Sequence, residues 1–206
     1  RSAAAGRVPG APPPSASAAR PALRRGVGIL VATSVIALAV VAAHRPDGAT
    51  RITVLDVGQG DAILLEGGHG GRLLIDGGPD PARLLIALGE RLPPWDRRID
   101  AVVLTHPHED HVAGLAALLA RYDVERVFEP GMIGPGPGYA AWSASLARGG
   151  PTHWSLATGD RLTVDDVDLQ VLWPDPGAVP LHRSDSGTSI NNVSIVLLGH
   201  VQGHAF

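Results

Sequence analysis

Cysteine is absent from this chain of 206 residues, which excludes a disulfide scaffold, thiolate zinc sites and cysteine-nucleophile chemistry. Lysine is absent as well, so all 17 basic residues other than histidine are arginines. The hydrophobic fraction of 45% is sufficient for a buried core and excludes a wholly disordered chain. The length suits one domain of ordinary size with additional segments, and not two full domains.

Acidic residues are missing from the first 44 positions, which carry five arginines and therefore a charge of +5. Residues 45–206 carry twelve arginines against twenty acids, a charge of −8. We expect the basic head and the acidic body to have different roles. The acidic body also argues against broad electrostatic binding of nucleic acid, which requires a positive surface.

The basic head has two parts. Residues 1–25 are rich in proline, alanine and serine without apolar periodicity, and we interpret them as a disordered linker. Residues 26–43 are eighteen consecutive residues without a charged side chain, which as a helix would span roughly 27 Å, close to the thickness of a bilayer core. The sequence therefore predicts a transmembrane helix at 26–44.

The charges around this apolar run predict its orientation. Arg20, Arg24 and Arg25 precede it, so the positive-inside bias places the head in the cytoplasm. Residues 46–206 are then expected on the extracytoplasmic side of the inner or plasma membrane. A signal peptide cleaved after Ala43 is the alternative, and it puts the body on the same side. Because the first residue is Arg1 and not Met, we expect a fragment or a processed product.

Strand and helix patterns alternate from residue 51 onward. Strands are predicted at 51–57, 62–66, 72–76, 99–105, 126–131, 161–174 and 191–199. Helices are predicted at 81–92, 112–122 and 139–148. Tight glycine-containing turns join the first strands, whereas helices separate several later ones. The predicted fold class is therefore mixed α/β (α+β) with a hairpin at its start.

Three histidines and an aspartate stand together in the segment THPHEDH, where an apolar strand runs into a helix. Imidazole and carboxylate are ligands suited to zinc, manganese or iron, and so many in one loop have little use in a core. In the loop, His106 and His108 can turn toward one ion. Asp110 and His111, in the first helical turn, can face a second ion beside it. The sequence predicts a metal site, and a surface loop of exposed histidines is the alternative.

These residues carry a resemblance to a known family. HPHEDH after an apolar strand, with LLIDGG upstream, is similar to the metallo-β-lactamase superfamily of binuclear metallohydrolases. The resemblance implies a four-layer αββα sandwich with two divalent ions, zinc or manganese, at one edge of its sheets. It also implies that Asp76 supports the metal-binding loop and that Asp110 is a ligand with a catalytic role. His106 and His108 would hold one ion, and Asp110 and His111 the other.

A second resemblance narrows the first. VLDVGQGDAILLE and SINNVSIVLL are similar to the start and the later part of the C-terminal domain of ComEC-type competence proteins, which build the inner-membrane channel for incoming DNA. A transmembrane helix directly upstream is also found in that family. The resemblance covers about residues 27–206. It implies as partners the membrane, DNA, the rest of the channel protein and other competence proteins.

The chain departs from the superfamily pattern at three ligands. A bridging Asp and a late His would both lie beyond Phe206, so we expect a truncated domain whose second site is incomplete and inactive. We also expect an exposed sheet edge that makes residues 46–206 alone prone to aggregate. SINNVS stands where many members place a third His, so Asn191 or Asn192 is expected near the metal. ComEC-type domains commonly share this last departure.

Two further groups of polar residues have no assigned role in the metal site. Asp56, Gln59 and Asp61, in DVGQGD, belong to a hairpin corner or to a substrate-positioning loop. The isolated histidines outside the motif are interpreted as surface residues: His44, His69, His153, His182, His200 and His204.

Three functions compete. The first is a metal-dependent nuclease domain of a membrane DNA-uptake channel, in which a metal-bound hydroxide attacks a phosphodiester. The second keeps the fold but hydrolyses an ester, lactone or β-lactam as an exported or membrane-anchored enzyme. The third is a catalytically inactive module of the channel. Sequence before residue 1 separates the first two, and sequence after residue 206 identifies the third.

Overall fold

The computed structural model describes residues 19–180 and 186–206, and the chain separates into two units with a boundary between Arg45 and Pro46. The predicted linker over residues 1–18 and the isolated His182 lie outside the described residues. The two units are described in turn.

The first unit contains the helix α1, Ala19–Ala43. The prediction of a disordered linker up to residue 25 is therefore wrong from Ala19 onward. Alanine, leucine and arginine are strong helix formers, and Pro21 lies in the first turn, where its missing N–H removes no helical hydrogen bond. By length and composition, Leu23–Ala43 could cross a membrane, and its side chains are exposed.

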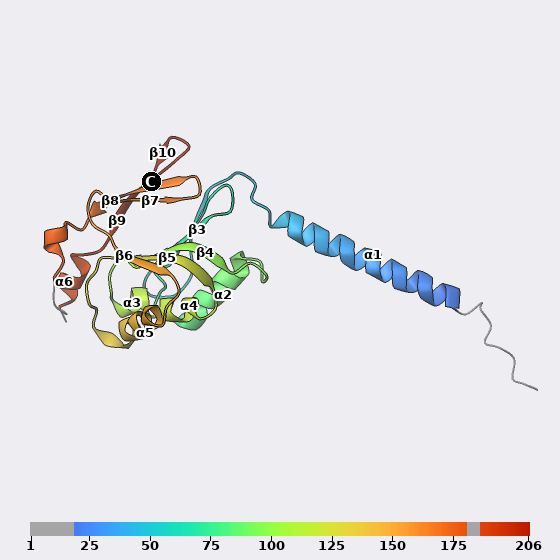
Figure 1. Ribbon diagram of the computed structural model, residues 1–206, viewed down its shortest axis with the longest axis horizontal. Helices are drawn as coiled ribbons and strands as arrows, with labels where there is room; N and C mark the ends of the chain where they lie inside the picture. Colours follow the sequence, from blue (N-terminus) through green and yellow to red (C-terminus); the bar gives the residue numbers. More distant parts are fainter. Residues whose placement is uncertain (1–18, 181–185) are drawn as a thin grey trace, which may run out of the picture. The chain divides into compact units, whose positions relative to one another are not determined.

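The second unit is built on two sheets (Figure 1). The first has the order β1-β2-β3-β4-β5-β6, with strands Arg51–Val54, Ile63–Glu66, Arg72–Ile75, Arg98–Val103, Asp123–Glu129 and Thr152–Ser155. The second has the order β10-β9-β8-β7, with β7 Arg161–Val164, β8 Val167–Trp173, β9 Val196–Val201 and β10 His204–Ala205. The first three strands pair antiparallel, and β3 to β6 pair parallel.

Helices cover the face of the six-stranded sheet that points away from the second sheet (Figure 1). They are α2 Pro81–Arg91, α3 Glu109–Val112, α4 Leu115–Leu119 and α5 Gly136–Ala147. A 3-10 turn, Pro176–Ala178, and a short helix α6, Gly187–Asn191, come between β8 and β9. The single helix predicted over 112–122 is divided at Gly114, where the close approach of the Gly77 carbonyl leaves no room for a Cβ.

The central strands of the six-stranded sheet are buried on both faces and supply two separate cores, whereas the edge strands β1 and β6 are largely exposed. Leu64 and Leu74 point toward the helices and join a cluster that also contains side chains of α2, α4 and α5. Their neighbours Leu65 and Leu73 point the opposite way and join a cluster with the second sheet. Successive strand residues point to opposite faces, so the apolar runs of β2 and β3 fill both cores at once.

The described residues of the second unit thus form a layer of helices, a six-stranded sheet and a four-stranded sheet (Figure 1). The outer face of the smaller sheet carries Leu172 and Val196, which are 43% and 47% exposed. The mixed α/β class and the sandwich of two sheets predicted from the sequence are confirmed, and the described residues form three of the four predicted layers.

Candidate metal centre

The topology of β3 and β4 places the THPHEDH loop. These strands run parallel, with Ile75 paired to Val103, so the residues that follow them emerge at the same edge of the sheet. Asp76 follows β3 and Thr105 follows β4. The loop then enters α3 at Glu109, and the hydrogen bond from Ile195 N to Thr105 O attaches the chain before β9 alongside.

Asp76 is the centre of a hydrogen-bond network beneath this loop. Its carboxylate is only 2% exposed. Oδ1 accepts a hydrogen bond from Thr105 N at 2.7 Å, and Oδ2 accepts one from Thr105 Oγ1 at 2.7 Å. His111 Nδ1 lies 2.8 Å from Oδ2. Asp76 also has a φ of 61°, a left-handed conformation that aspartate adopts more readily than most residues and that is concentrated at functional sites.

This network decides which nitrogen of each histidine is free to bind a metal. With Asp76 ionised, His111 Nδ1–H donates to it, so His111 Nε2 carries the lone pair. The Thr105 hydroxyl has one proton and donates it to Asp76. His106 Nδ1, 3.0 Å from Thr105 Oγ1, must therefore be the donor in that contact. Both rings thus present an unprotonated Nε2, as metal-ligating histidines with such partners usually do.

The three imidazoles of the motif lie against one another. The His106 ring centroid is 5.0 Å from that of His108 and 4.0 Å from that of His111. His111 Nε2 and Asp110 Oδ2 are 3.9 Å apart. Two ligand atoms on one tetrahedral ion would be roughly 3.3 Å apart for bond lengths of about 2.0–2.1 Å. The spacing of this one pair therefore fits a divalent cation after a small closure.

The pKa shift of His106 agrees with this arrangement, whereas the shifts of His111 and Asp76 favour a protonated ring and a protonated carboxyl. Burial, followed by the neighbouring His111 and His108, lowers the pKa of His106 to about 4, so this ring is neutral at pH 7. Burial also opposes the charged form of His111, but the hydrogen bond and charge of Asp76 outweigh it and raise the His111 pKa. Burial raises the pKa of Asp76, against the hydrogen bonds from His111 and Thr105. A bound cation would favour the ionised carboxylate.

Two further segments border the site. The Glu109 carboxylate accepts hydrogen bonds from Gly138 N at 2.8 and 3.1 Å, which caps the start of α5 and ties it to the metal-binding loop. A Cβ on Gly187, in the first turn of α6, would lie 3.8 Å from the His108 ring. Thr105 and Glu109 were not predicted as site residues, although both stand inside the motif THPHEDH.

The second half of the DVGQGD turn, Gly60 and Asp61, lies against the site. A Cβ on Gly60 would lie 2.0 Å from the Asp110 carbonyl oxygen, so only glycine allows the turn to pack against α3. Asp61 follows it, accepts a hydrogen bond from Gly78 N at its carbonyl, and contributes to the raised pKa of His111. Asp56 and Gln59 are exposed, and Asp56 accepts a hydrogen bond from Gly58 N across the turn. The turn is therefore both a hairpin corner and a wall of the site.

The asparagines lie on the α6 side of the site. Asn191 is the last residue of α6 and Asn192 its C-cap, rather than the start of a strand as predicted. Both are exposed, and the Asn192 carbonyl accepts a hydrogen bond from Trp173 Nε1 at 2.6 Å. Their proximity to a bound metal stays a prediction.

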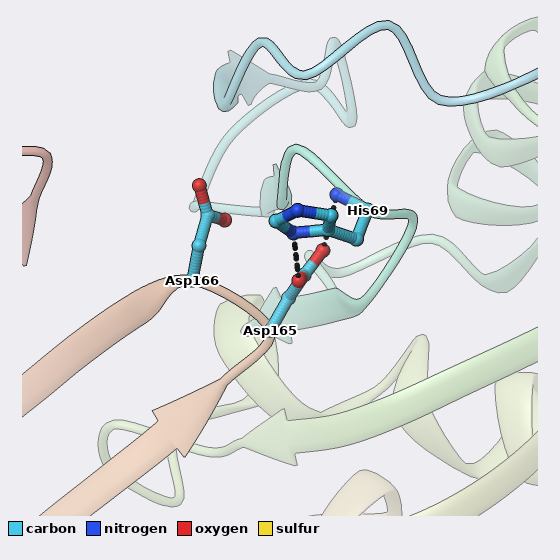
Figure 2. A group of neighbouring side chains, drawn as sticks. All are labelled: His69, Asp165 and Asp166. Atoms are coloured by element: carbon cyan, nitrogen blue, oxygen red, sulfur yellow. Dashed lines mark hydrogen bonds and ion pairs between the residues drawn. The ribbon is translucent and has the colours of Figure 1, made fainter.

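A second group of ligand-type side chains lies in the described part of the unit, at two hairpin turns (Figure 2). His69, Asp165 and Asp166 bring one nitrogen or oxygen each within 4.8 Å of one another. Asp165 accepts hydrogen bonds from the N–H groups of His69 and Gly71, and its other oxygen lies 2.9 Å from His69 Nδ1. Asp166 accepts from Gly68 N. These bonds join the two hairpin turns to each other.

In this site a buried carboxylate orients two histidine rings at the edge of a sandwich of two sheets. This arrangement is typical of metal-dependent hydrolases. The chain belongs to the metallo-beta-lactamase superfamily, whose family model matches residues 55–200.

Particular relatives show how far the similarity extends. A hydroxyacylglutathione hydrolase of Cereibacter sphaeroides is 29% identical over 151 residues, covering 72% of this chain and 52% of the relative. A hydroxyacylglutathione hydrolase of Aeromonas hydrophila is 42% identical over 83 residues, covering 40% of this chain and 28% of the relative. The chain thus spans about half the length of the first of these relatives and less of the second.

Among solved structures, the metallo-beta-lactamase fold protein YhfI of Bacillus subtilis superimposes with a TM-score of 0.50 at 15% identity. The match covers 76% of this chain and 60% of the other. At this identity the likeness supports the fold alone.

Proposed function

We propose that the second unit is a metal-dependent phosphodiesterase, the nuclease domain of a ComEC-type DNA-uptake channel, anchored by α1 on the extracytoplasmic side of the membrane. The observation that carries the proposal is the packing of the DVGQGD turn against the metal-binding helix, with Gly60 against Asp110. That turn distinguishes the ComEC-type sequence from other members of the superfamily. Its partners would be the membrane, DNA, the remainder of the channel and other competence proteins.

The residues that would hold a divalent ion, zinc or manganese, are His106 and His108, with Asp110 and His111 for a second ion. Such ions would lower the pKa of a bound water and stabilise charge on the phosphodiester oxygens. Asp76 keeps the proton of His111 on Nδ1 and orients the His106 ring through Thr105.

A second candidate function is thioester hydrolysis. The relatives named above are hydroxyacylglutathione hydrolases, and the superfamily site is common to both reactions. On this alternative the DVGQGD turn would border a pocket for a glutathione thioester instead of a nucleic acid strand.

Parallel hydrolysis assays on the full-length protein separate the two candidates. We expect manganese- or zinc-dependent cleavage of single-stranded DNA and of bis(p-nitrophenyl) phosphate, and loss of both activities in His108→Ala and Asp110→Ala. Glu90→Gln, at the exposed end of α2, is the control that should retain activity. Cleavage of a hydroxyacylglutathione without cleavage of either phosphodiester would replace the nuclease with the thioesterase. No metal-dependent hydrolysis of any of these substrates would favour the inactive module.

A further inference from the structure

An exposed aromatic groove that includes none of the metal ligands lies between the edge strands of the two sheets. Its walls come from β5, β6 and β7, and its volume is about 350 Å³. Trp154 of β6 is 47% exposed and lies over Phe128 of β5, with ring centroids 5.5 Å apart and planes 21° from parallel. One face of the Trp154 indole is therefore packed while its other surface remains open to a ligand.

Two arginines border this aromatic pair. Arg126 donates hydrogen bonds to the backbone carbonyls of Asp100 and Thr163 and has no carboxylate within 4.0 Å among the described residues. Arg161 is exposed at the start of β7, and no ion pair involves it in the described part of the chain. The one acid in the groove, Asp160, accepts a hydrogen bond from Ala157 N. The groove thus presents two uncompensated guanidinium groups in a body that is acidic overall.

We propose that this groove binds a nucleotide unit, with the base stacked on Trp154 and the phosphate held by Arg161 and Arg126. An exposed ring flanked by arginines is the combination with which proteins hold single-stranded nucleic acid, because every base offers a π face and guanidinium groups bind phosphate. A purely aliphatic ligand would use the indole but offer no negative charge to the two guanidinium groups.

The position of the groove relates it to the metal centre. Trp154 is paired with Phe128, and Phe128 with Val103, so two strand spacings, roughly 10 Å, separate Trp154 from the strand that leads into the THPHEDH loop. Strands β4 to β6 are parallel, and the groove therefore opens near the same edge as the metal ligands. In this form the inference rests on the proposed function, since it gives the strand being cleaved a second point of attachment.

Binding can be measured without catalysis. The 206-residue chain in detergent, with EDTA present, would be titrated with a short single-stranded oligodeoxynucleotide, with an abasic oligomer of equal length and with a mononucleotide. We expect Trp154→Ala to weaken oligonucleotide binding about 5- to 150-fold, the range for loss of one stacked base, and Trp154→Phe to retain most of the affinity. Arg161→Ala should raise the Kd and reduce the slope of log K against log salt by about one.

The controls make each outcome decisive. Trp95→Ala removes an indole that is 57% exposed on the loop after α2, and it should not change the affinity. Thermal melting of each variant separates loss of binding from loss of folding, and Trp154→Phe keeps the test valid if the alanine variant unfolds. Equal affinity for the abasic oligomer, or no effect of Trp154→Ala in a folded protein, overturns the proposal. A mononucleotide bound as tightly as the oligonucleotide assigns the groove to a free nucleotide.

The binding assay and the hydrolysis assay can reject the nucleotide site and the nuclease independently of each other. Base-dependent binding at Trp154 without phosphodiester cleavage leaves a nucleotide site and rejects the nuclease. Metal-dependent cleavage of bis(p-nitrophenyl) phosphate, together with a DNA affinity that Trp154→Ala does not change, supports the nuclease and rejects the nucleotide site. If both hold, Trp154→Ala should raise the KM for DNA and leave the kcat for the small phosphodiester unchanged.

Discussion

A single buried carboxylate organises the site of this protein. Asp76 accepts three hydrogen bonds within 2.8 Å, and through them it fixes the Thr105 hydroxyl and the His111 ring, and indirectly the His106 ring. Since each bond fixes a proton as well as a direction, the carboxylate determines which nitrogens are available to a metal. The sequence motif identifies the ligands, but the selection of their tautomers depends on this residue outside the motif.

Removal of the Asp76 charge should weaken metal binding more than it weakens the fold. In Asp76→Asn, one oxygen becomes an NH2 group that cannot accept from Thr105 or His111. We expect a 10- to 100-fold loss of zinc affinity, the usual effect of losing such a supporting group, in titrations against a competing chelator. Asp76→Ala leaves three buried donors without an acceptor and should lower the free energy of unfolding by about 3–5 kcal/mol. Unchanged zinc affinity in Asp76→Asn would contradict this role.

Among the elements, the two linked hairpin turns are the feature that local patterns did not predict. The turn Gly67–Gly71 joins β2 to β3, and Asp165 and Asp166 join β7 to β8 about a hundred residues later (Figure 2). A Cβ at Gly67 or Gly71 would come within 2.5–2.6 Å of the Asp165 side chain. Gly67 and Gly71 of GGHGG are therefore required by the side chain of Asp165. This contact is distant in the sequence, so local sequence patterns could not predict it.

Asp165 should make stability depend on pH in the acidic range. Although burial opposes it, hydrogen bonds from Gly71 and His69 lower the pKa of Asp165. The folded state therefore holds its proton less tightly than the unfolded state, in which the pKa is about 3.9. The stabilisation is complete above about pH 5 and is lost as the pH falls through the lowered pKa. The Tm of Asp165→Asn should lie below wild type at pH 7, and the difference should shrink toward pH 3.

Asparagine suits this test because it tolerates the φ of 58° that Asp165 adopts. Asp168→Asn, on the exposed outer side of the same hairpin, is the matched control. A constant difference in Tm between wild type and Asp165→Asn at all pH values would show that shape, and not charge, is what matters there.

Two capping carboxylates allow a comparison between helices. Glu109 accepts from Gly138 N at the start of α5, and Asp80 accepts from Ala82 N and Arg83 N at the start of α2. Each alanine variant should lose about 1 kcal/mol of stability, because each removes one cap. Only Glu109→Ala should also weaken zinc binding, since Glu109 belongs to the metal-binding loop. An equal loss of zinc affinity in Asp80→Ala would mean that general destabilisation explains the effect.

The sequence predicted which helices and strands form better than it predicted the residues at which they begin and end. Continuous apolar runs located β2, β3 and β4, because successive strand side chains point to two buried faces there. The helix at 112–122 was predicted without its break, since the contact between Gly114 and the Gly77 carbonyl is made only in the folded unit. Asn191 and Asn192 were predicted in a strand, but Ser186 accepts a hydrogen bond from Ser189 N and starts α6 instead.

At the scale of the whole molecule, the charge asymmetry and α1 predict membrane attachment. The chain expressed in bacterial cells should remain in the membrane fraction after extraction at alkaline pH, with residues 46–206 accessible to protease added from the extracytoplasmic side. Ile36→Arg places a charge near the centre of the span at a cost of about 2.5–3.5 kcal/mol and should reduce retention, whereas Ile36→Leu should not. Release of wild type, or protection of residues 46–206, would reject the proposed topology.

The described ligands and their support come from one continuous stretch, Asp76 to His111, and the second sheet begins only at β7. A ribosome adds about 5–20 residues per second, so the 95 residues after His111 take roughly 5–20 s to synthesise. Strands β3 and β4, whose parallel pairing brings Asp76 to Thr105, are complete before that interval starts. The histidines thus exist as a group on the growing chain before the strands that cover the other face of their sheet have been translated.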